Sequence, residues 1–275
     1  MLRLIRKLLM RDISKRWENY RRANQDRPSV RENERRRVFE LVNPQPGQRI
    51  LEVGTGNGFL TFPLAEAVGH TGQVTTADVT EENIDDVERS NAIRKLNITT
   101  LLFDENDEAP FSKKHADFFD AVVSLATLHH FDNRAKGTGE RGRRRVLTEF
   151  HQVLKPDGKL ILADPADDTI TQKYFDRIDN PKYCFPEGHP HDFFRVERLR
   201  EVVKELGFRD IAAEVRHVPW KFDSEKAAKD FVHTIHNAQC GEEESFAVAQ
   251  EVLGLKKANR HYELGWELFF LTAHK

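Results

Sequence analysis

Residues 50–58 carry the strongest chemical signal in this chain of 275 residues. The segment is an apolar run that contains the acid Glu52 and leads into a turn with Gly54, Gly56 and Gly58. Glycines let a backbone turn sharply out of a strand and approach a bound ligand, where any Cβ would collide. The spacing therefore predicts a binding turn for a nucleoside-containing cofactor.

The turn departs from the dinucleotide-binding pattern in two ways. That pattern, G-x-G-x-x-G, expects a third glycine where this chain has Phe59, and it places a pyrophosphate over a helix N-terminus. Glu52 would add negative charge to such a site and oppose a pyrophosphate. A cofactor with a cationic, zwitterionic head suits Glu52 better.

The segment from Glu52 to Gly58 resembles the first motif of class I S-adenosylmethionine-dependent methyltransferases, which has the form D/E-x-G-x-G-x-G. Later segments resemble that family's second to fifth strands in the same order: 74–78, 101–104, 119–124 and 154–162. Any one of these motifs is a weak signal, but the ordered set is specific. Over residues 30–275 the chain is identified by this resemblance as a member of the family, of the small-molecule type.

The resemblance implies both a fold and a cofactor. The implied fold class is α/β: a Rossmann-like three-layer sandwich with a mostly parallel seven-stranded sheet, whose strand seven runs antiparallel between strands five and six. The implied cofactor is S-adenosylmethionine (SAM), and ligands of such sheets lie outside the carboxyl ends of the strands. The expected cofactor-binding residues are Glu52, Gly54, Thr55, Gly56, Gly58, Asp78, Val79, Asp104, Glu105, Ser124 and Leu125.

The resemblance also implies individual roles. The glycines would line the methionine and ribose parts of SAM, with Glu52 near the ammonium end. Asp78 is placed to accept both ribose hydroxyls with its two carboxylate oxygens, although it could simply cap a helix. Asp104 should face the adenine amino group, with the Glu105 backbone beside it, unless residues 104–108 are only an acidic surface loop.

A pair of histidines, His129 and His130, follows the fourth expected strand. In the resembled family this loop faces the methyl acceptor. A histidine with an ordinary pKa of about 6.5 can take a proton from a hydroxyl or amine as it attacks a methyl group. Either histidine is therefore a candidate general base; the alternative is that both pack and hydrogen-bond the loop. The chain lacks an Asn-Pro-Pro-Tyr type sequence here, which counts against a DNA adenine or cytosine N-methyltransferase.

A second acceptor-facing segment is expected before the helix at 195–206. The expected acceptor-binding residues are His129, His130, Tyr183, His189, His191 and Phe194. The alternative is that the aromatic residues of this loop belong to the core. No metal site is expected, because the spacing of the histidines near Cys184 and Asp192 matches no known ligand pattern.

Periodicity and turn residues predict the supporting elements. The division is an N-terminal helical extension or lid, 1–46, and a methyltransferase domain, 47–275, with a helical or loop substrate lid at about 165–198. Expected strands are 49–53, 73–77, 99–103, 119–125, 159–163, 211–218 and 266–272, and expected helices are 31–41, 81–96, 143–154, 195–206, 223–238 and 243–256. The strand at 119–125 is apolar throughout, as expected for a strand buried on both faces.

Composition limits the partners. There are 43 Lys and Arg against 45 Asp and Glu, so overall charge gives no argument for nucleic acid. Only Cys184 and Cys240 are present, which excludes a disulfide framework and fits a cytoplasmic location.

Residues 1–20 predict a basic amphipathic helix that packs on the domain or contacts a membrane surface. They resemble neither a signal peptide nor a transmembrane segment.

The function predicted from the sequence is transfer of the SAM methyl group to an O or N atom of a small molecule by direct displacement. Three alternatives stay open. RNA or protein methylation has support only from the arginines between residues 21 and 37, and lipid or quinone methylation at a membrane surface has support only from residues 1–20. A non-catalytic module with the same fold is the third, because fold does not fix function. The acceptor and the oligomeric state cannot be read from the sequence.

Overall fold

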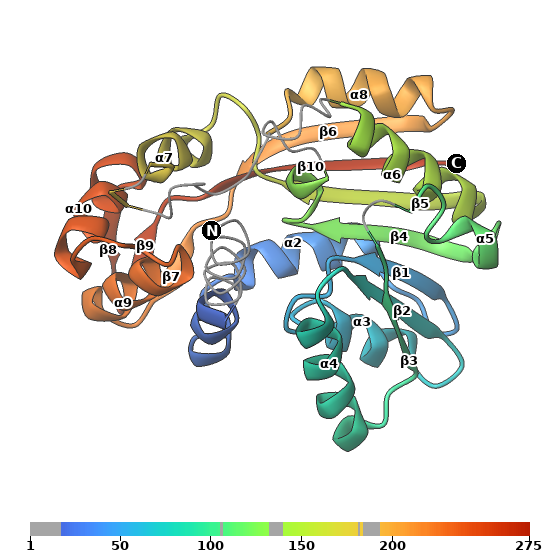
Figure 1. Cartoon of the computed structure of the whole chain (residues 1–275), viewed down its shortest axis with the longest axis horizontal. Coiled ribbons are helices and arrows are strands. Elements are labelled where there is room, and N and C mark those ends of the chain that lie inside the picture. Colours follow the sequence, from blue (N-terminus) through green and yellow to red (C-terminus); the bar gives the residue numbers. More distant parts are fainter. Residues whose placement is uncertain (1–17, 105–106, 132–139, 181, 184–192) are drawn as a thin grey trace, which may run out of the picture. The chain divides into compact units, whose positions relative to one another are not determined.

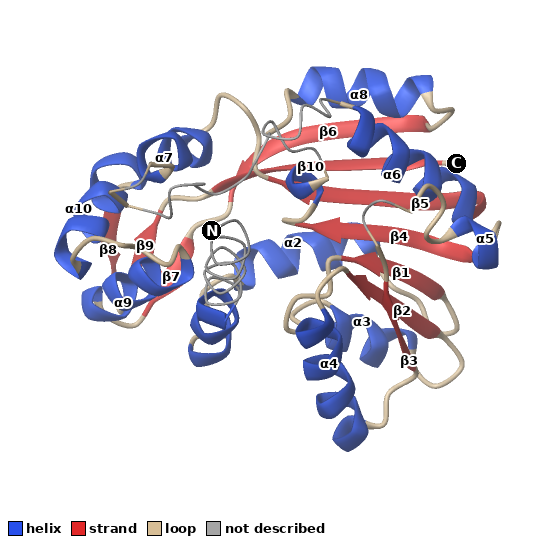
Figure 2. Ribbon diagram, viewed as in Figure 1, coloured by secondary structure: helices blue, strands red, loops and turns tan. Residues whose placement is uncertain are grey.

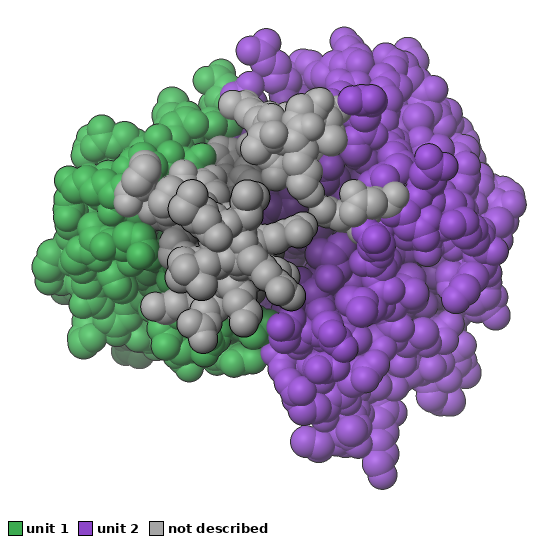
Figure 3. Space-filling model, viewed as in Figure 1, with its two compact units in different colours: residues 1–33, 168–190, 217–267 green, residues 34–167, 191–216, 268–275 purple. Residues whose placement is uncertain are grey.

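The structure, a computed structural model, describes residues 18–104, 107–131, 140–180, 182–183 and 193–275. The chain forms two compact units (Figure 3). The larger consists of Glu34–Asp167, His191–Arg216 and Leu268–Lys275, and the smaller of Met1–Asn33, Asp168–Pro190 and His217–Glu267. The expected domain boundary between residues 46 and 47 stays a prediction.

A seven-stranded sheet forms the frame of the larger unit (Figure 1). Its strands are β1 Arg49–Val53, β2 Gln73–Asp78, β3 Ile98–Leu102, β4 Phe119–Leu125, β5 Leu154–Asp164, β6 Arg209–His217 and β10 Glu267–His274. The order across the sheet is β3-β2-β1-β4-β5-β10-β6. Strands β1 to β5 pair in parallel, whereas β10 runs antiparallel to β5. The predicted α/β fold, with an antiparallel last strand, is confirmed.

Helices pack along this sheet (Figure 2). They are α2 Glu32–Val42, α3 Thr61–Val68, α4 Glu81–Arg94, α5 Ser112–His115, α6 Arg141–Val153 and α8 Val196–Glu205, with a short 3-10 helix, η1, at Leu128–His130. Helices α3 and α4 contact β1 to β3, and α6 contacts β5. Apolar side chains of β1, β4, β5 and β10 form the centre of the core, including Leu51, Val122, Leu162 and Phe269. Their burial is the main stabilisation of the unit.

Strand order decides where a ligand can bind. The chain runs from β1 outward to β2 and β3, then returns to β4 on the other side of β1. The carboxyl ends of β1 and β4 therefore flank the point where strand order reverses, and a crevice forms at such a point. Glu52, Asp78, Ser124 and Asp164 all lie at or near the carboxyl ends of neighbouring strands in this region.

The smaller unit contains α7 Ile170–Ile178, α9 Glu225–Ile235, α10 Glu242–Leu253 and a three-stranded antiparallel sheet (Figure 1). The strands are β7 Trp220–Phe222, β8 Leu255–Ala258 and β9 His261–Leu264, in the order β7-β9-β8. The stacked rings of Trp220 and Trp266, 4.0 Å between centroids, lie in its core. Residues 18–26 are helical; the rest of the expected helix over residues 1–20 lies outside the described residues.

Some predicted boundaries are wrong. The helix expected over 243–256 ends at Leu253, because Gly254 has a φ of +73° and the next residues pair as β8. Strand β5 begins at Leu154 and not at 159, since Leu154 already pairs with Phe119 of β4. In the described part of the chain, no helix combines the length and apolar character needed to cross a membrane.

Candidate active site

The turn after β1 needs glycine at three places. Gly54, Gly56 and Gly58 have φ values of +97°, +51° and +81°, in the region that other residues rarely adopt. A Cβ on Gly54 would lie 1.9 Å from Thr127 Oγ1, whereas a Cβ on Gly56 would meet no atom within 4 Å. The turn therefore packs against Thr127 at Gly54, whereas the space beside Gly56 is open and lets a ligand approach the backbone.

Asp78 lies directly beside this turn. Its Oδ2 accepts hydrogen bonds from the Gly56 amide and from Asn83 Nδ2, each at 3.1 Å, and its Oδ1 accepts from the Thr80 amide at 2.9 Å. The residue is 8% exposed. A carboxylate has about four lone-pair positions, so one position is left for a ligand hydroxyl in this arrangement. Helix capping alone would not require the bond to Gly56.

Glu52 lies beneath the turn. It is 2% exposed, and its Oε2 accepts hydrogen bonds from Thr61 Oγ1 at 2.5 Å and Thr76 Oγ1 at 2.8 Å. Thr55 Oγ1 lies 2.7 Å from Thr76 Oγ1, so the hydroxyls connect Glu52 to the glycine turn. Burial raises the pKa of Glu52 to about 7; the two threonine hydroxyls oppose this shift, and the negative charge of Asp78 adds to it. Its expected place near the cofactor's ammonium group stays a prediction.

The carboxyl end of β4 lies next to the same turn. Ser124 is buried, and its Oγ has no hydrogen-bond partner among the residues that the structure describes. Ala126 has a φ of +53° and donates its amide hydrogen to Ala163 O at 2.7 Å, which bends the chain into η1. Thr127, at the start of η1, fills the space beside Gly54. The first turn and the loop after β4 are thus in direct contact.

Asp164, at the end of β5, organises the histidine loop. It is 1% exposed; its Oδ2 accepts the amide hydrogens of Thr127 at 3.0 Å and Leu128 at 2.7 Å, and its Oδ1 lies 2.5 Å from His129 Nδ1. An ionised carboxylate only accepts hydrogen bonds, so this contact assigns the hydrogen to Nδ1 and the lone pair of the neutral ring to Nε2. Sequence reasoning missed Asp164, although it is an acid that closes a predicted strand, as Asp78 is.

The two histidines differ in their surroundings. The His129 ring is buried, with the His130 ring 3.9 Å away and the Phe193 ring 5.6 Å away between centroids. His130 is half-buried, and its amide donates to Thr127 O at 3.0 Å.

Phe194 is buried against Phe269, which favours the alternative that this aromatic ring belongs to the core.

The remaining expected residues are distributed as follows. Val79, next to Asp78, is 48% exposed and presents an apolar surface at the edge of the sheet. Asp104 is exposed after β3, and Tyr183 belongs to the smaller unit, where its carbonyl accepts the Gln239 amide hydrogen at 3.0 Å. Glu105, His189 and His191 lie outside the described residues. Within the described ranges, no group of His, Cys, Asp and Glu is arranged to hold a metal ion.

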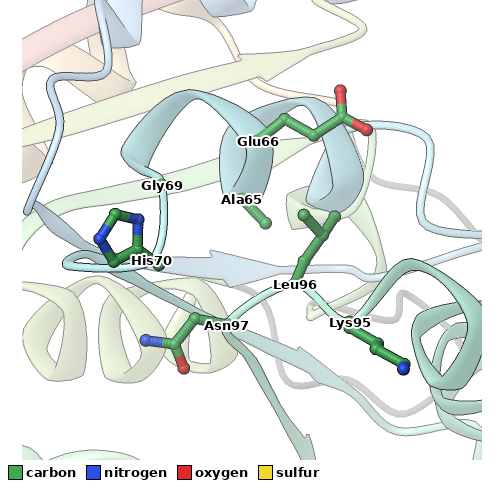
Figure 4. Close-up of a pocket in the computed structure, with 7 residues that line it drawn as sticks. All are labelled: Ala65, Glu66, Gly69, His70, Lys95, Leu96 and Asn97. Carbon is green, nitrogen blue, oxygen red and sulfur yellow. The ribbon is translucent and has the colours of Figure 1, made fainter.

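A surface pocket lies at the amino ends of the parallel strands, where α3 and α4 end and β2 and β3 begin (Figure 4). It is lined by Ala65, Glu66, Gly69, His70, Lys95, Leu96 and Asn97. None of the expected site residues lines it. The candidate active site lies at the carboxyl ends of the strands and not at this pocket.

A family model described as a methyltransferase domain matches residues 18–213, which include the whole arrangement around Gly56, Asp78 and Asp164. The chain belongs to the methyltransferase-domain family. This confirms the resemblance to class I SAM-dependent methyltransferases, and SAM is the cofactor that goes with it. The residues of this methyltransferase-domain protein fit that group, since the open backbone at Gly56 and the carboxylate of Asp78 lie side by side.

Curated relatives and solved structures agree with this family. The chain is 29% identical over 131 residues to nocamycin O-methyltransferase of Saccharothrix syringae, covering 48% of this chain and 42% of that protein. It is 29% identical over 123 residues to the ubiquinone/menaquinone biosynthesis C-methyltransferase UbiE of Paraburkholderia phymatum, covering 45% of each. The match thus spans less than half the length of either relative. A SAM-dependent methyltransferase from Aquifex aeolicus shares the fold, with a TM-score of 0.54, 18% identity, and coverage of 91% of this chain and 95% of that one.

Proposed function

We propose that this methyltransferase-domain protein transfers the methyl group of SAM to an oxygen or nitrogen atom of a small-molecule acceptor. The observation that carries the proposal is the hydrogen bond between the Gly56 amide and Asp78 Oδ2, which joins the carboxyl ends of β1 and β2 beside the point where strand order reverses. It joins a backbone open to a ligand with a carboxylate that has one position left to accept a sugar hydroxyl. Methyltransferase relatives with the same domain support the reaction type.

Bound SAM would supply an electrophilic methyl group on its sulfonium. The chain's own residues would bind and orient it: the glycine turn along the methionine and ribose parts, Asp78 on the ribose and the exposed Val79 against the adenine. Alignment of the two reactants in a site that excludes water can contribute about 7–11 kcal/mol in ideal systems. Proton removal from the acceptor is then the one further task for the protein.

His129 is the proposed proton acceptor. The buried Asp164 holds its Nδ1, so Nε2 is the ring atom that would take a proton from the attacking hydroxyl or amine. A carboxylate that holds an imidazole in this way also stabilises the imidazolium that forms. His130 would then contribute to the wall of the acceptor site. A histidine that accepts a proton is needed when the acceptor atom loses a proton on methylation, as a hydroxyl oxygen or an amine nitrogen does.

Methylation of carbon is the second candidate, because one relative is named as a ubiquinone/menaquinone biosynthesis C-methyltransferase. It also needs removal of a proton, so the same histidine could act. RNA and protein acceptors have less support, since the chain carries a net charge of −2 and no basic excess. We place the protein in the cytoplasm because it has only two cysteines, and we expect a small-molecule partner because one relative is named as a nocamycin O-methyltransferase.

Two experiments test the proposal. Calorimetric titration with SAM and with S-adenosylhomocysteine (SAH) should give binding heat for both ligands. Incubation with methyl-labelled SAM and panels of phenols, amines and quinols should then label a small-molecule product whose mass increases by one methylene. Binding without turnover on any panel would favour the non-catalytic module, and absence of binding would remove the proposal.

A further inference from the structure

Glu52 is a buried carboxyl group that can hold or release a proton without rearrangement of the backbone. Thr61 and Thr76 contact its Oε2, and Thr55 extends the chain of hydroxyls to the glycine turn. A hydroxyl can donate or accept by rotation. The threonine hydroxyls therefore donate hydrogen bonds to Glu52 when it is ionised, and one of them can accept a hydrogen bond from Glu52 when it is protonated.

In the described part of the chain, no positively charged side chain acts on Glu52. In the sheet it pairs with Thr76 of β2 and Val123 of β4, and on α3 it meets Thr61. Among the described residues, the charge that acts on it is Asp78, which is negative. Burial and this like charge together favour the neutral form and raise its pKa to about 7. A cation arriving next to the turn would reverse that preference.

The methyl donor and its product differ by such a cation. SAM and SAH have the same ammonium and carboxylate groups, but only SAM has a positively charged sulfur. We propose that Glu52 distinguishes donor from product: it releases its proton when SAM binds over the glycine turn and regains one when the methyl group has been transferred. This inference depends on the proposed function, because it places the methionine part of the cofactor above Glu52.

The direction of the pH effect follows from this exchange. Below neutral pH the free protein carries a proton on Glu52, and SAM must displace it, so SAM affinity should rise with pH. SAH brings the same ammonium and carboxylate without the sulfonium, so its affinity should change less with pH than that of SAM. If a bound sulfonium lowers the pKa of Glu52 by about one unit, the preference for SAM over SAH should grow about fivefold between pH 5.5 and 7.5. The neutral product would be released more readily than the donor.

Calorimetry of the wild-type full chain tests the inference without any variant. Titrations with SAM and with SAH at pH 6.5, repeated in buffers of different ionisation enthalpy, give the number of protons exchanged on binding. We expect SAM to release about half a proton more than SAH. Equal proton release with both ligands would overturn the inference and leave the proposed function standing. If neither ligand binds, both fail.

Two variants assign the proton. Glu52→Gln should abolish the difference in proton release between SAM and SAH, because an amide cannot titrate. His129→Gln should retain the difference, which controls for proton exchange at the histidine loop. The ligand's own ammonium titrates at about 7.7–8.0, so it contributes little at pH 6.5 and is common to all three proteins. A difference that persists in Glu52→Gln would assign the proton elsewhere and contradict the inference.

Discussion

The side chain of Thr127 occupies the space that a Cβ would need at Gly54, since a Cβ built there would lie 1.9 Å from Thr127 Oγ1. This contact joins the turn after β1 to the loop after β4. The first carries the proposed cofactor contacts and the second carries the histidines. The two halves of the site are therefore fixed relative to each other by one glycine and one threonine.

Gly54→Ala should destabilise the protein more than an ordinary glycine substitution. It adds the clash with Thr127 to the strain of a φ of +97°, and the strain alone costs about 1–2 kcal/mol. Gly69→Ala is the matched control, because Gly69 has a φ of +66° but no atom within 4 Å of its Cβ position. Urea unfolding should rank Gly54→Ala below Gly69→Ala, and Gly54→Ala with Thr127→Gly should approach the control, because the Thr127 Cβ itself lies 2.7 Å from the position of the added Cβ. Equal stability of the two single variants would contradict the contact.

Asn83→Leu should strengthen the fold and weaken cofactor binding. Asn83 donates to Asp78 Oδ2, but its own Oδ1 is buried without a hydrogen-bond partner among the described residues, which costs about 1–3 kcal/mol. Leucine removes the unpaired oxygen and its cost, and it also removes the hydrogen bond that Asn83 donates to Asp78. We expect an equal or higher free energy of unfolding and about tenfold weaker SAH binding.

Asn91→Leu is the control on the same helix. Asn91 both donates to Leu96 O and accepts from the Leu96 amide, so its amide group is fully used in structure. This variant should lose stability and keep SAH affinity. If Asn83→Leu behaves in the same way, Asn83 does not position Asp78.

His129→Ala should lower kcat by about 10²–10⁴ with SAH affinity unchanged, because a positioned general base contributes roughly that factor. Asp164→Asn should also lower kcat, since its amide nitrogen would face His129 Nδ1 and move the ring hydrogen to Nε2. Nitrogen NMR of the imidazole reads this change of tautomer directly. His130→Ala serves as the comparison and should retain more activity. Wild-type rates in both histidine variants would remove the base from the mechanism.

The stability of the protein should fall as pH rises through the titration of Glu52. Its pKa is about 7 in the folded state against an ordinary value of 4.5, so the folded state prefers the neutral acid. The associated stability is fully present below pH 4.5 and lost by pH 7 and above, with a total of about 3 kcal/mol. Glu52→Gln should be more stable than wild type at pH 8 in urea unfolding. A larger advantage at pH 5 than at pH 8 would contradict the burial of this carboxyl.

The central sheet and the glycine turn could be predicted because their signals are local. Apolar runs, an acid at the end of a strand and closely spaced glycines are readable within a few residues. The role of Asp164 could not be predicted, because it depends on contact with His129, 35 positions earlier in the chain. The burial of Glu52 likewise depends on Thr76, 24 positions away. The sheet of the smaller unit was missed because strands of three or four residues are too short to show alternation.

The central claim is that the glycine turn and Asp78 together hold the adenosyl part of SAM, and titration of wild type and Asp78→Ala with SAH tests it most directly. Asp85→Ala, at an exposed acid of α4, is the control for charge. Wild type and control should bind SAH equally, and Asp78→Ala should bind about 100-fold more weakly, because hydrogen bonds to a charged group contribute about 1.5–3 kcal/mol each. An Asp78→Ala protein that is folded and binds SAH as tightly as wild type would contradict the account.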